Sequence, residues 1–116
     1  MAFVATQNAA KARKFYEGKL GLKVTSDDPF AIALDANGTM LRVQKVKKVA
    51  PAQYTALGWR VADITATIRQ LNKAGVKFER FAGMPQDEDA VWTSPSGAKI
   101  AWFKDPDGNI LSLTEF

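Results

Sequence analysis

The residue types that most often perform catalysis or bind metals are missing from this chain. The sequence contains neither His nor Cys, which excludes the commonest metal ligand, the commonest general base and every thiolate nucleophile. A general acid or base would have to be Asp, Glu, Lys or Tyr. The acidic run 87–89 is typical of a solvated turn, and Tyr16 falls on an expected helix. The sequence therefore offers no nucleophile with an adjacent base.

The C-terminal stretch "WFKDPDGNILSLTEF", residues 102–116, predicts a β-hairpin. Two apolar runs flank residues 105–109, whose Asp, Pro, Gly and Asn favour turn geometry. Pairing across this turn places Trp102 opposite Ser112 on one face. Residues 111 and 113 would then face the helices, because side chains alternate along a strand. A small hydroxyl thus stands on the open face of the last strand.

Length and composition indicate one folded domain. The chain has 116 residues, of which 47% are hydrophobic and 24% charged, and this is enough for a core without disulfides. The net charge is +4, but the basic residues are scattered, and the densest run is only "VQKVKKV" at 43–49. We therefore expect no nucleic-acid partner. Without a signal peptide or a long apolar span, we also expect no membrane partner and a cytoplasmic location.

A repeated order of elements organises the chain. Asn8 and Asp63 stand at N-cap positions 55 residues apart, and Gly21 and Gly75 end the two helices that follow. This predicts two βαβββ modules, at about 1–48 and 56–116, joined by a linker at about 49–55. The expected strands are 2–6, 23–25, 30–35 and 39–46, then 57–61, 76–81, 90–94, 97–103 and 110–116.

These modules predict an α+β fold. Neither module could bury both faces of its own sheet, so the two should combine into a curved mixed sheet, a half-barrel groove, with the helices on its outer face.

Four motifs give the chain a family resemblance. They are "FYEGKLGLKV" (15–24), "VADI" (61–64), "AGVKF" (74–78) and "FKDPDGNIL" (103–111). Together they resemble the vicinal oxygen chelate superfamily, which includes glyoxalase I, extradiol dioxygenases and the bleomycin-resistance binding proteins. The resemblance covers essentially the whole chain. It implies the groove fold and a homodimer.

The resemblance also implies where a catalytic metal would bind. Most enzymes of this superfamily hold a divalent metal with a His in the first strand, a His opening the second module and a Glu in the last strand. These positions correspond to Met1, Ala56 and Ser112 here. Glu115 lies three positions further on and faces the other way. We therefore expect no metal and no other cofactor.

Strand alternation predicts the residues of the groove. The expected ligand-binding residues are Phe3, Arg42, Gln44, Arg60, Trp102, Ser112 and Thr114. Arg offers a planar fork for carboxylate or phosphate, and Trp stacks on rings. Each residue also has a simpler interpretation as a solvated strand position, a core residue or part of an interface.

The favoured function is metal-free binding of a small molecule with an apolar body and an anionic or polar end. The sequence leaves two alternatives open: a metal-dependent enzyme of the glyoxalase or dioxygenase type, and a structural protein whose own side chains fill the groove. No catalytic residue is assigned.

Overall fold

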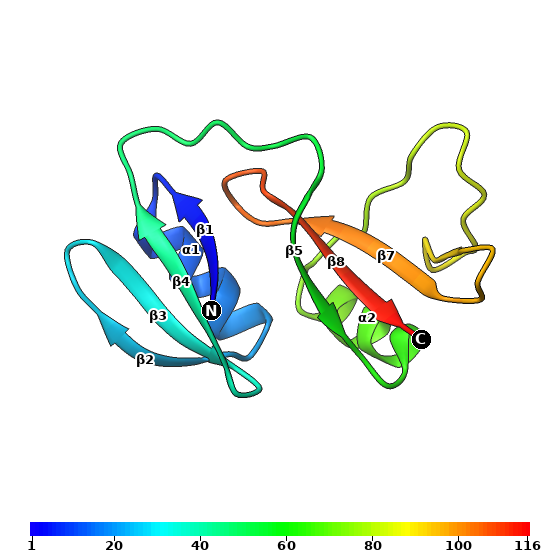
Figure 1. Ribbon diagram of the computed structural model, residues 1–116, viewed down its shortest axis with the longest axis horizontal. Coiled ribbons are helices and arrows are strands. Elements are labelled where there is room, and N and C mark those ends of the chain that lie inside the picture. Colours follow the sequence, from blue (N-terminus) through cyan, green and yellow to red (C-terminus); the bar gives the residue numbers. More distant parts are fainter.

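The chain forms two four-stranded sheets with the helices packed on one side of them (Figure 1). The computed structural model describes residues 1–116. The first half contains β1 (Ala2–Thr6), α1 (Ala9–Arg13), the π-helical η1 (Lys14–Lys19), β2 (Lys23–Asp27), β3 (Ala31–Ala36) and β4 (Thr39–Lys45). The second half contains β5 (Thr55–Arg60), α2 (Ile64–Lys73), β6 (Trp92–Thr93), β7 (Lys99–Lys104) and β8 (Ile110–Glu115).

The two sheets have the same topology. Their strand orders are β1-β4-β3-β2 and β5-β8-β7-β6. In each sheet the first strand pairs in parallel with the last, and the other pairs are antiparallel. The edge strands β1 and β5 lie next to each other where the two sheets meet. The predicted α+β class is confirmed, and the curved mixed sheet expected from the two modules consists of two four-stranded mixed sheets, one from each half, that do not close into a barrel.

The second half differs from the prediction between its helix and its last hairpin. Residues 76–81 make only an isolated bridge, between Phe78 and Phe103, and the strand expected at 90–94 is reduced to β6. Gln86 explains this locally, because its side-chain amide donates to the carbonyls of Glu79 and Ala90. Ala90 also has a φ of 66°, which interrupts an extended strand. A side chain therefore satisfies backbone groups that a strand partner would otherwise bind.

The helix boundaries follow the predicted caps. The side chains of Asn8 and Asp63 accept hydrogen bonds from the backbone N–H groups of Lys11 and Ala66, each at 3.1 Å, as N-caps do. Gly75 follows α2 with a φ of 93°, where a Cβ would be strained. The first helix differs from a regular α-helix because its second half widens into η1.

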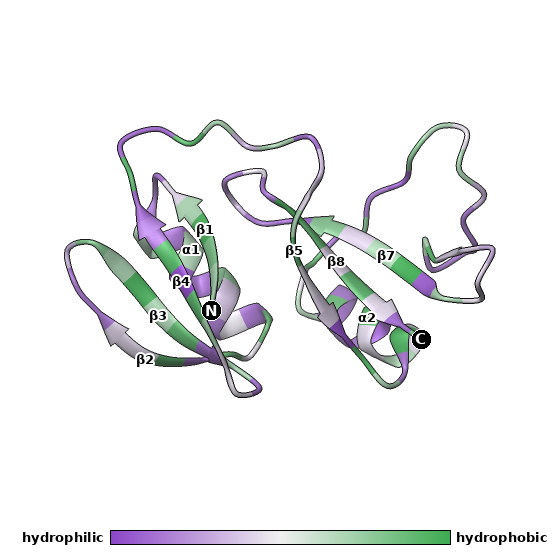
Figure 2. Ribbon diagram, in the orientation of Figure 1, coloured by the Kyte–Doolittle hydropathy of each residue, from purple (hydrophilic) through white to green (hydrophobic).

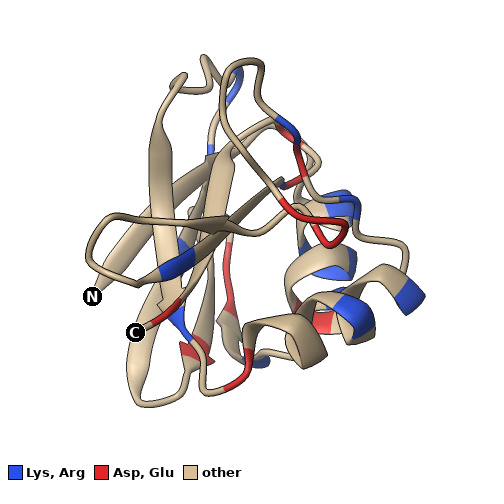
Figure 3. Cartoon of the chain, turned by 90° about the vertical axis from the view of Figure 1, so that its right-hand side faces the viewer, with Lys and Arg blue, Asp and Glu red and all other residues tan.

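The core lies between the sheets and the helices. Leu41, Val43, Leu111 and Leu113 are buried in it, as strand alternation predicted. Figure 2 shows the corresponding alternation of hydrophobic and hydrophilic segments along β4 and β7. The side view in Figure 3 places both helices on the same side of the strands. The opposite face of each sheet is therefore left without a helical cover.

Charged residues are spread over helices, strands and turns (Figure 3). Asp27 pairs with Arg13 at 2.9 Å and with Lys45 at 2.6 Å. The hydrogen bond from Lys45 is the main reason that the pKa of Asp27 is lowered. Neither helix has the length and apolar character needed to cross a membrane.

A buried carboxylate ties the last hairpin to the first half of the chain. The carboxylate of Asp105 accepts a hydrogen bond from the hydroxyl of Tyr16 at 2.6 Å. It also accepts hydrogen bonds from the backbone and side-chain N–H groups of Asn109. Asn109 in turn donates to the carbonyl of Ala5 in β1 at 2.9 Å. Figure 1 shows this turn, between β7 and β8, extending toward β1. Burial, followed by the negative charge of Asp105, raises the pKa of Tyr16, which keeps it a donor.

The strands β5 and β8 approach closely at one pair of small residues. Gly58 lies opposite Ser112, and a Cβ added to Gly58 would stand 2.6 Å from the Ser112 hydroxyl oxygen but 3.9 Å from the Ser112 Cβ. The hydroxyl therefore occupies the space that any side chain at position 58 would need.

Replacing Tyr16 by Phe tests the buried network. We expect Tyr16→Phe to lower the free energy of unfolding by about 1.5–3 kcal/mol, because a charged acceptor loses a donor in a buried place. Urea titration with an unchanged m-value measures the effect. Tyr54→Phe is the matched control, since Tyr54 is 73% exposed. Equal stability of both variants would contradict this account.

Replacing Gly58 by Ala tests the close approach of β5 and β8. We expect Gly58→Ala to destabilise the chain by about 1–3 kcal/mol through overpacking. Ser112→Ala in the same chain should recover most of the loss, because only the hydroxyl is too near. A double-mutant cycle of thermal or urea unfolding measures the coupling. Additive effects of the two changes would refute the proposed contact.

Candidate functional site

The uncovered face of the first sheet presents three of the predicted binding residues. Phe3 pairs with Arg42 and Ala5 pairs with Gln44 across β1 and β4. Their neighbours Leu41 and Val43 are buried on the helix side, so Phe3, Arg42 and Gln44 share the open face. Phe3 is 51% exposed. An apolar ring and a guanidinium therefore lie side by side on an accessible surface.

Arg42 has a carboxylate in its neighbourhood. The pKa of Asp28 is lowered mainly by hydrogen bonds from the backbone N–H groups of Phe30 and Ala31, and the positive charge of Arg42 contributes. Asp28 already receives both of those backbone bonds, at 2.8 and 2.9 Å. The guanidinium makes no ion pair within 4.0 Å, so its donors are available to an incoming anion.

The uncovered face of the second sheet holds the other four predicted residues. Trp102 lies opposite Ser112, as predicted, and Thr114 lies beside Arg60 in β5. Ser112 is only 7% exposed, because it packs over Gly58. It therefore contributes shape to this face more than an accessible hydroxyl.

Trp102 is fixed in an aromatic corner. Its indole Nε1–H donates to the hydroxyl of Thr55 at 3.1 Å. Phe81 meets the indole edge to face at 5.5 Å between ring centroids, and Trp92 lies 6.2 Å away. A cavity of about 160 Å³ remains beside Trp102, and exposed Tyr54 forms part of its wall. The corner combines a preoriented ring with a small open space.

Sequence reasoning missed most of this corner. Thr55, Phe81 and Met84 line the same cavity as Trp102, but alternation along a strand cannot place residues of a linker or a long loop. Only the aromatic character of Phe81 and Tyr54 could have drawn attention to them. Tertiary contacts decide where the loop that carries Phe81 and Met84 lies.

Arg60 differs from Arg42 because its guanidinium has an internal partner. Its guanidinium carbon lies 5.5 Å from the centre of the Phe116 ring, a cation–π geometry. Arg60 also lines a cavity of about 250 Å³ between β5 and the first sheet, together with the three preceding residues of β5, Leu57, Gly58 and Trp59. Arg60 thus stands at the meeting of the two halves, with its charge partly engaged.

The residues at the implied metal positions do not fit a divalent metal. Met1 and Ala56 have no suitable donor atom, and Ala56 is the extra residue of a bulge between Thr55 and Leu57. The Ser112 hydroxyl is packed against Gly58. Glu115, as expected, faces the other way: it accepts the N–H of Ile64 at the start of α2. No group of three His, Cys, Asp or Glu side chains gathers anywhere in the structure.

Solved structures of similar fold cover nearly the whole chain. A member of the glyoxalase/bleomycin resistance protein/dioxygenase superfamily from Sphaerobacter thermophilus is 25% identical, with a TM-score of 0.78 over 99% of this chain and 94% of that one. A glyoxalase family protein from Enterococcus faecalis is 24% identical, with a TM-score of 0.74 and the same coverage. Lactoylglutathione lyase from Agrobacterium tumefaciens is 14% identical, with a TM-score of 0.75 over 99% and 92%.

A family model matches the sequence directly, although no curated protein matches it. The model describes the Glyoxalase/Bleomycin resistance protein/Dioxygenase superfamily, and it matches residues 1–113. Sequence match and fold agree with the resemblance carried by the four motifs. The chain therefore belongs to the Glyoxalase/Bleomycin resistance protein/Dioxygenase superfamily.

Proposed function

We propose that this protein binds a small molecule in its groove without a metal ion. The ligand has an apolar, ring-containing body and an anionic end. The observation that carries the proposal is the uncovered face, where exposed Phe3 and Arg42 lie on one sheet and the fixed indole of Trp102 lies on the other. Binding sites of this kind combine apolar walls with a few oriented polar groups.

Charge favours an anionic over a cationic ligand. The chain carries a net charge of +4, and Arg42 is the groove residue whose guanidinium is not engaged by an internal ion pair or ring. Arg binds carboxylate and phosphate with two parallel hydrogen bonds. Arg42 therefore supplies the polar end of the site, and Phe3 and Trp102 supply its apolar part.

Preorganisation supports binding at the second sheet. The hydrogen bond from Trp102 to Thr55 and the packing of Phe81 hold the indole in one orientation. A ring that is already ordered loses little side-chain entropy when a ligand stacks on it. The neighbouring cavity leaves space for part of a ligand.

A structural role is the alternative that the same corner favours. Phe81 and Trp92 already contact Trp102, so the chain's own side chains fill part of the groove. A ligand screen separates the two functions. A thermal-shift series of aromatic carboxylates and their uncharged esters should show larger stabilisation by the acids. No stabilisation by any member of the series would favour the structural role.

The role of Arg42 is tested with the best carboxylate from that series. We expect Arg42→Ala to weaken binding by about 1.5–3 kcal/mol, the range for a charge-assisted hydrogen bond, or roughly 10-fold to 150-fold in Kd. Isothermal titration calorimetry measures the change. Arg69→Ala is the matched control, because it removes the same charge from helix α2. Unchanged affinity in Arg42→Ala would remove this residue from the site.

The metal-free state is tested by elemental analysis. Untagged protein is incubated with Zn²⁺, Ni²⁺, Mn²⁺ and Fe²⁺ and then desalted, and we expect far less than one equivalent of each. Ser112→Glu should also remain without tight metal, because the positions of Met1 and Ala56 still offer no ligand. Circular dichroism verifies that this variant is folded. One equivalent of metal in the unaltered protein would restore the enzyme alternative.

A further inference from the structure

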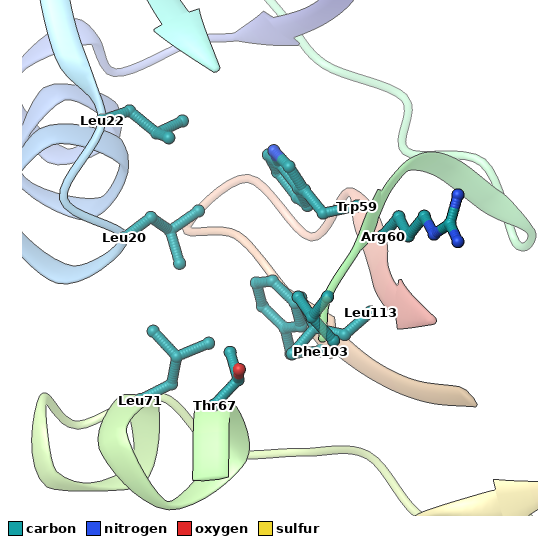
Figure 4. Close-up of a pocket in the computed structure, with 9 residues that line it drawn as sticks. Leu20, Leu22, Trp59, Arg60, Thr67, Leu71, Phe103 and Leu113 are labelled. Carbon is teal, nitrogen blue, oxygen red and sulfur yellow. The ribbon is translucent and has the colours of Figure 1, made fainter. Parts of the chain in front are cut away.

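A further cavity lies on the helix side of the second sheet, and it shares Trp59 and Arg60 with the cavity of about 250 Å³ described above. It has a volume of about 170 Å³, and Figure 4 shows its lining side chains converging from several elements. The lining is predominantly apolar and consists of Leu20, Leu22, Trp59, Arg60, Val61, Thr67, Leu71, Phe103 and Leu113. We refer to this space as the helix-side cleft.

The helix-side cleft is distinct from the groove because it opens on the opposite face of the sheet. Trp59 and Phe103 stack within it at 6.4 Å with an angle of 20° between their rings, and both belong to the core side. Trp102 and Ser112 are the strand neighbours that point to the groove. Neither of them lines the helix-side cleft.

The walls come from both halves of the chain. Leu20 and Leu22 follow η1 in the first half, whereas Trp59 belongs to β5 and Leu71 to α2. In Figure 4 the leucine side chains face Trp59 and Phe103 across the open space. A molecule bound there would contact both halves at once and bury apolar surface of each.

The hydroxyl of Thr67 and the guanidinium of Arg60 at the helix-side cleft are already engaged or turned away. The hydroxyl of Thr67 donates to the carbonyl of Asp63 at 2.8 Å. Arg60 points away from the other lining side chains in Figure 4, and its guanidinium lies against Phe116. A charged molecule would lose its hydration without gaining a partner. The lining therefore selects for an uncharged occupant.

We propose that the helix-side cleft binds a small, uncharged, apolar molecule of the size of benzene or toluene. An enclosed apolar protein cavity of roughly 150 Å³ lined by Leu, Ile and Phe binds benzene, and the helix-side cleft has a similar volume and a similarly apolar lining, with one side open to solvent. This inference does not depend on the ligand proposed for the groove. Toluene is the probe that matches the space.

A toluene titration followed by methyl NMR tests the proposal. With uniformly ¹³C-labelled protein, we expect saturable shifts at the methyl groups of Leu22, Leu71 and Leu113, and none at Ile110 beside the groove. Leu22→Trp fills the space and should weaken binding by roughly tenfold or more, since the occupant loses its cavity. Val24→Phe is the control, because Val24 packs against the core without lining the helix-side cleft.

Each other outcome has a definite meaning. Shifts at Ile110 or Met84 in place of the leucines would place toluene in the aromatic corner and overturn the proposal. Linear shifts without saturation, or equal binding by Leu22→Trp and Val24→Phe, would also overturn it. If Leu22→Trp does not fold, Leu71→Phe replaces it as the filling variant. The localisation in the unaltered protein stands independently of both.

Discussion

The arrangement of the two halves depends on one buried carboxylate. Asp105 accepts hydrogen bonds from the hydroxyl of Tyr16 in the first half and from backbone N–H groups of its own turn. The side chain of Asn109 donates a hydrogen bond to the carbonyl of Ala5. A buried charge is stable only when its acceptor sites are filled, so the turn, the helix and β1 must all be in place together. This network fixes the end of β1 against the turn between β7 and β8. It therefore also fixes how Phe3 and Arg42 stand relative to the second sheet.

The Ser112 hydroxyl lies over Gly58 of the neighbouring strand. Because β5 comes so near, position 58 has no room for a side chain while that hydroxyl is in place. Met1, Ala56 and Ser112, the residues at the implied metal positions, together provide no carboxylate and no imidazole.

The second sheet separates two environments that differ in polarity. Trp102 occupies the open face, where a hydroxyl orients it and solvent is near. Trp59 occupies the helix side, where it stacks on Phe103 in an apolar space. Trp59 lies in β5 and Trp102 lies in β7. Side chains alternate between the two faces along each strand, and these two positions fall on opposite faces of the sheet. The two faces of this sheet therefore differ in polarity and in access to solvent.

The sequence by itself determined the local features. Period-two and helical patterns predicted the repeat, the caps at Asn8 and Asp63, the hairpin that pairs Trp102 with Ser112, and which strand residues face the core. These depend on backbone geometry and neighbouring residues, which a short stretch of sequence specifies. The same reasoning failed at 76–81, because Gln86 bonds to backbone groups across the loop and replaces a strand partner.

Only the tertiary structure decided the contacts between distant segments. Phe81 reaches Trp102, Phe116 engages Arg60, and Leu20 approaches Trp59 and Leu71 to enclose the helix-side cleft. No spacing in the sequence specifies these pairs, because they depend on how complete elements pack once the Asp105 network has joined the halves. The sequence therefore determined which faces are apolar, and tertiary packing decided where those faces leave space for a ligand.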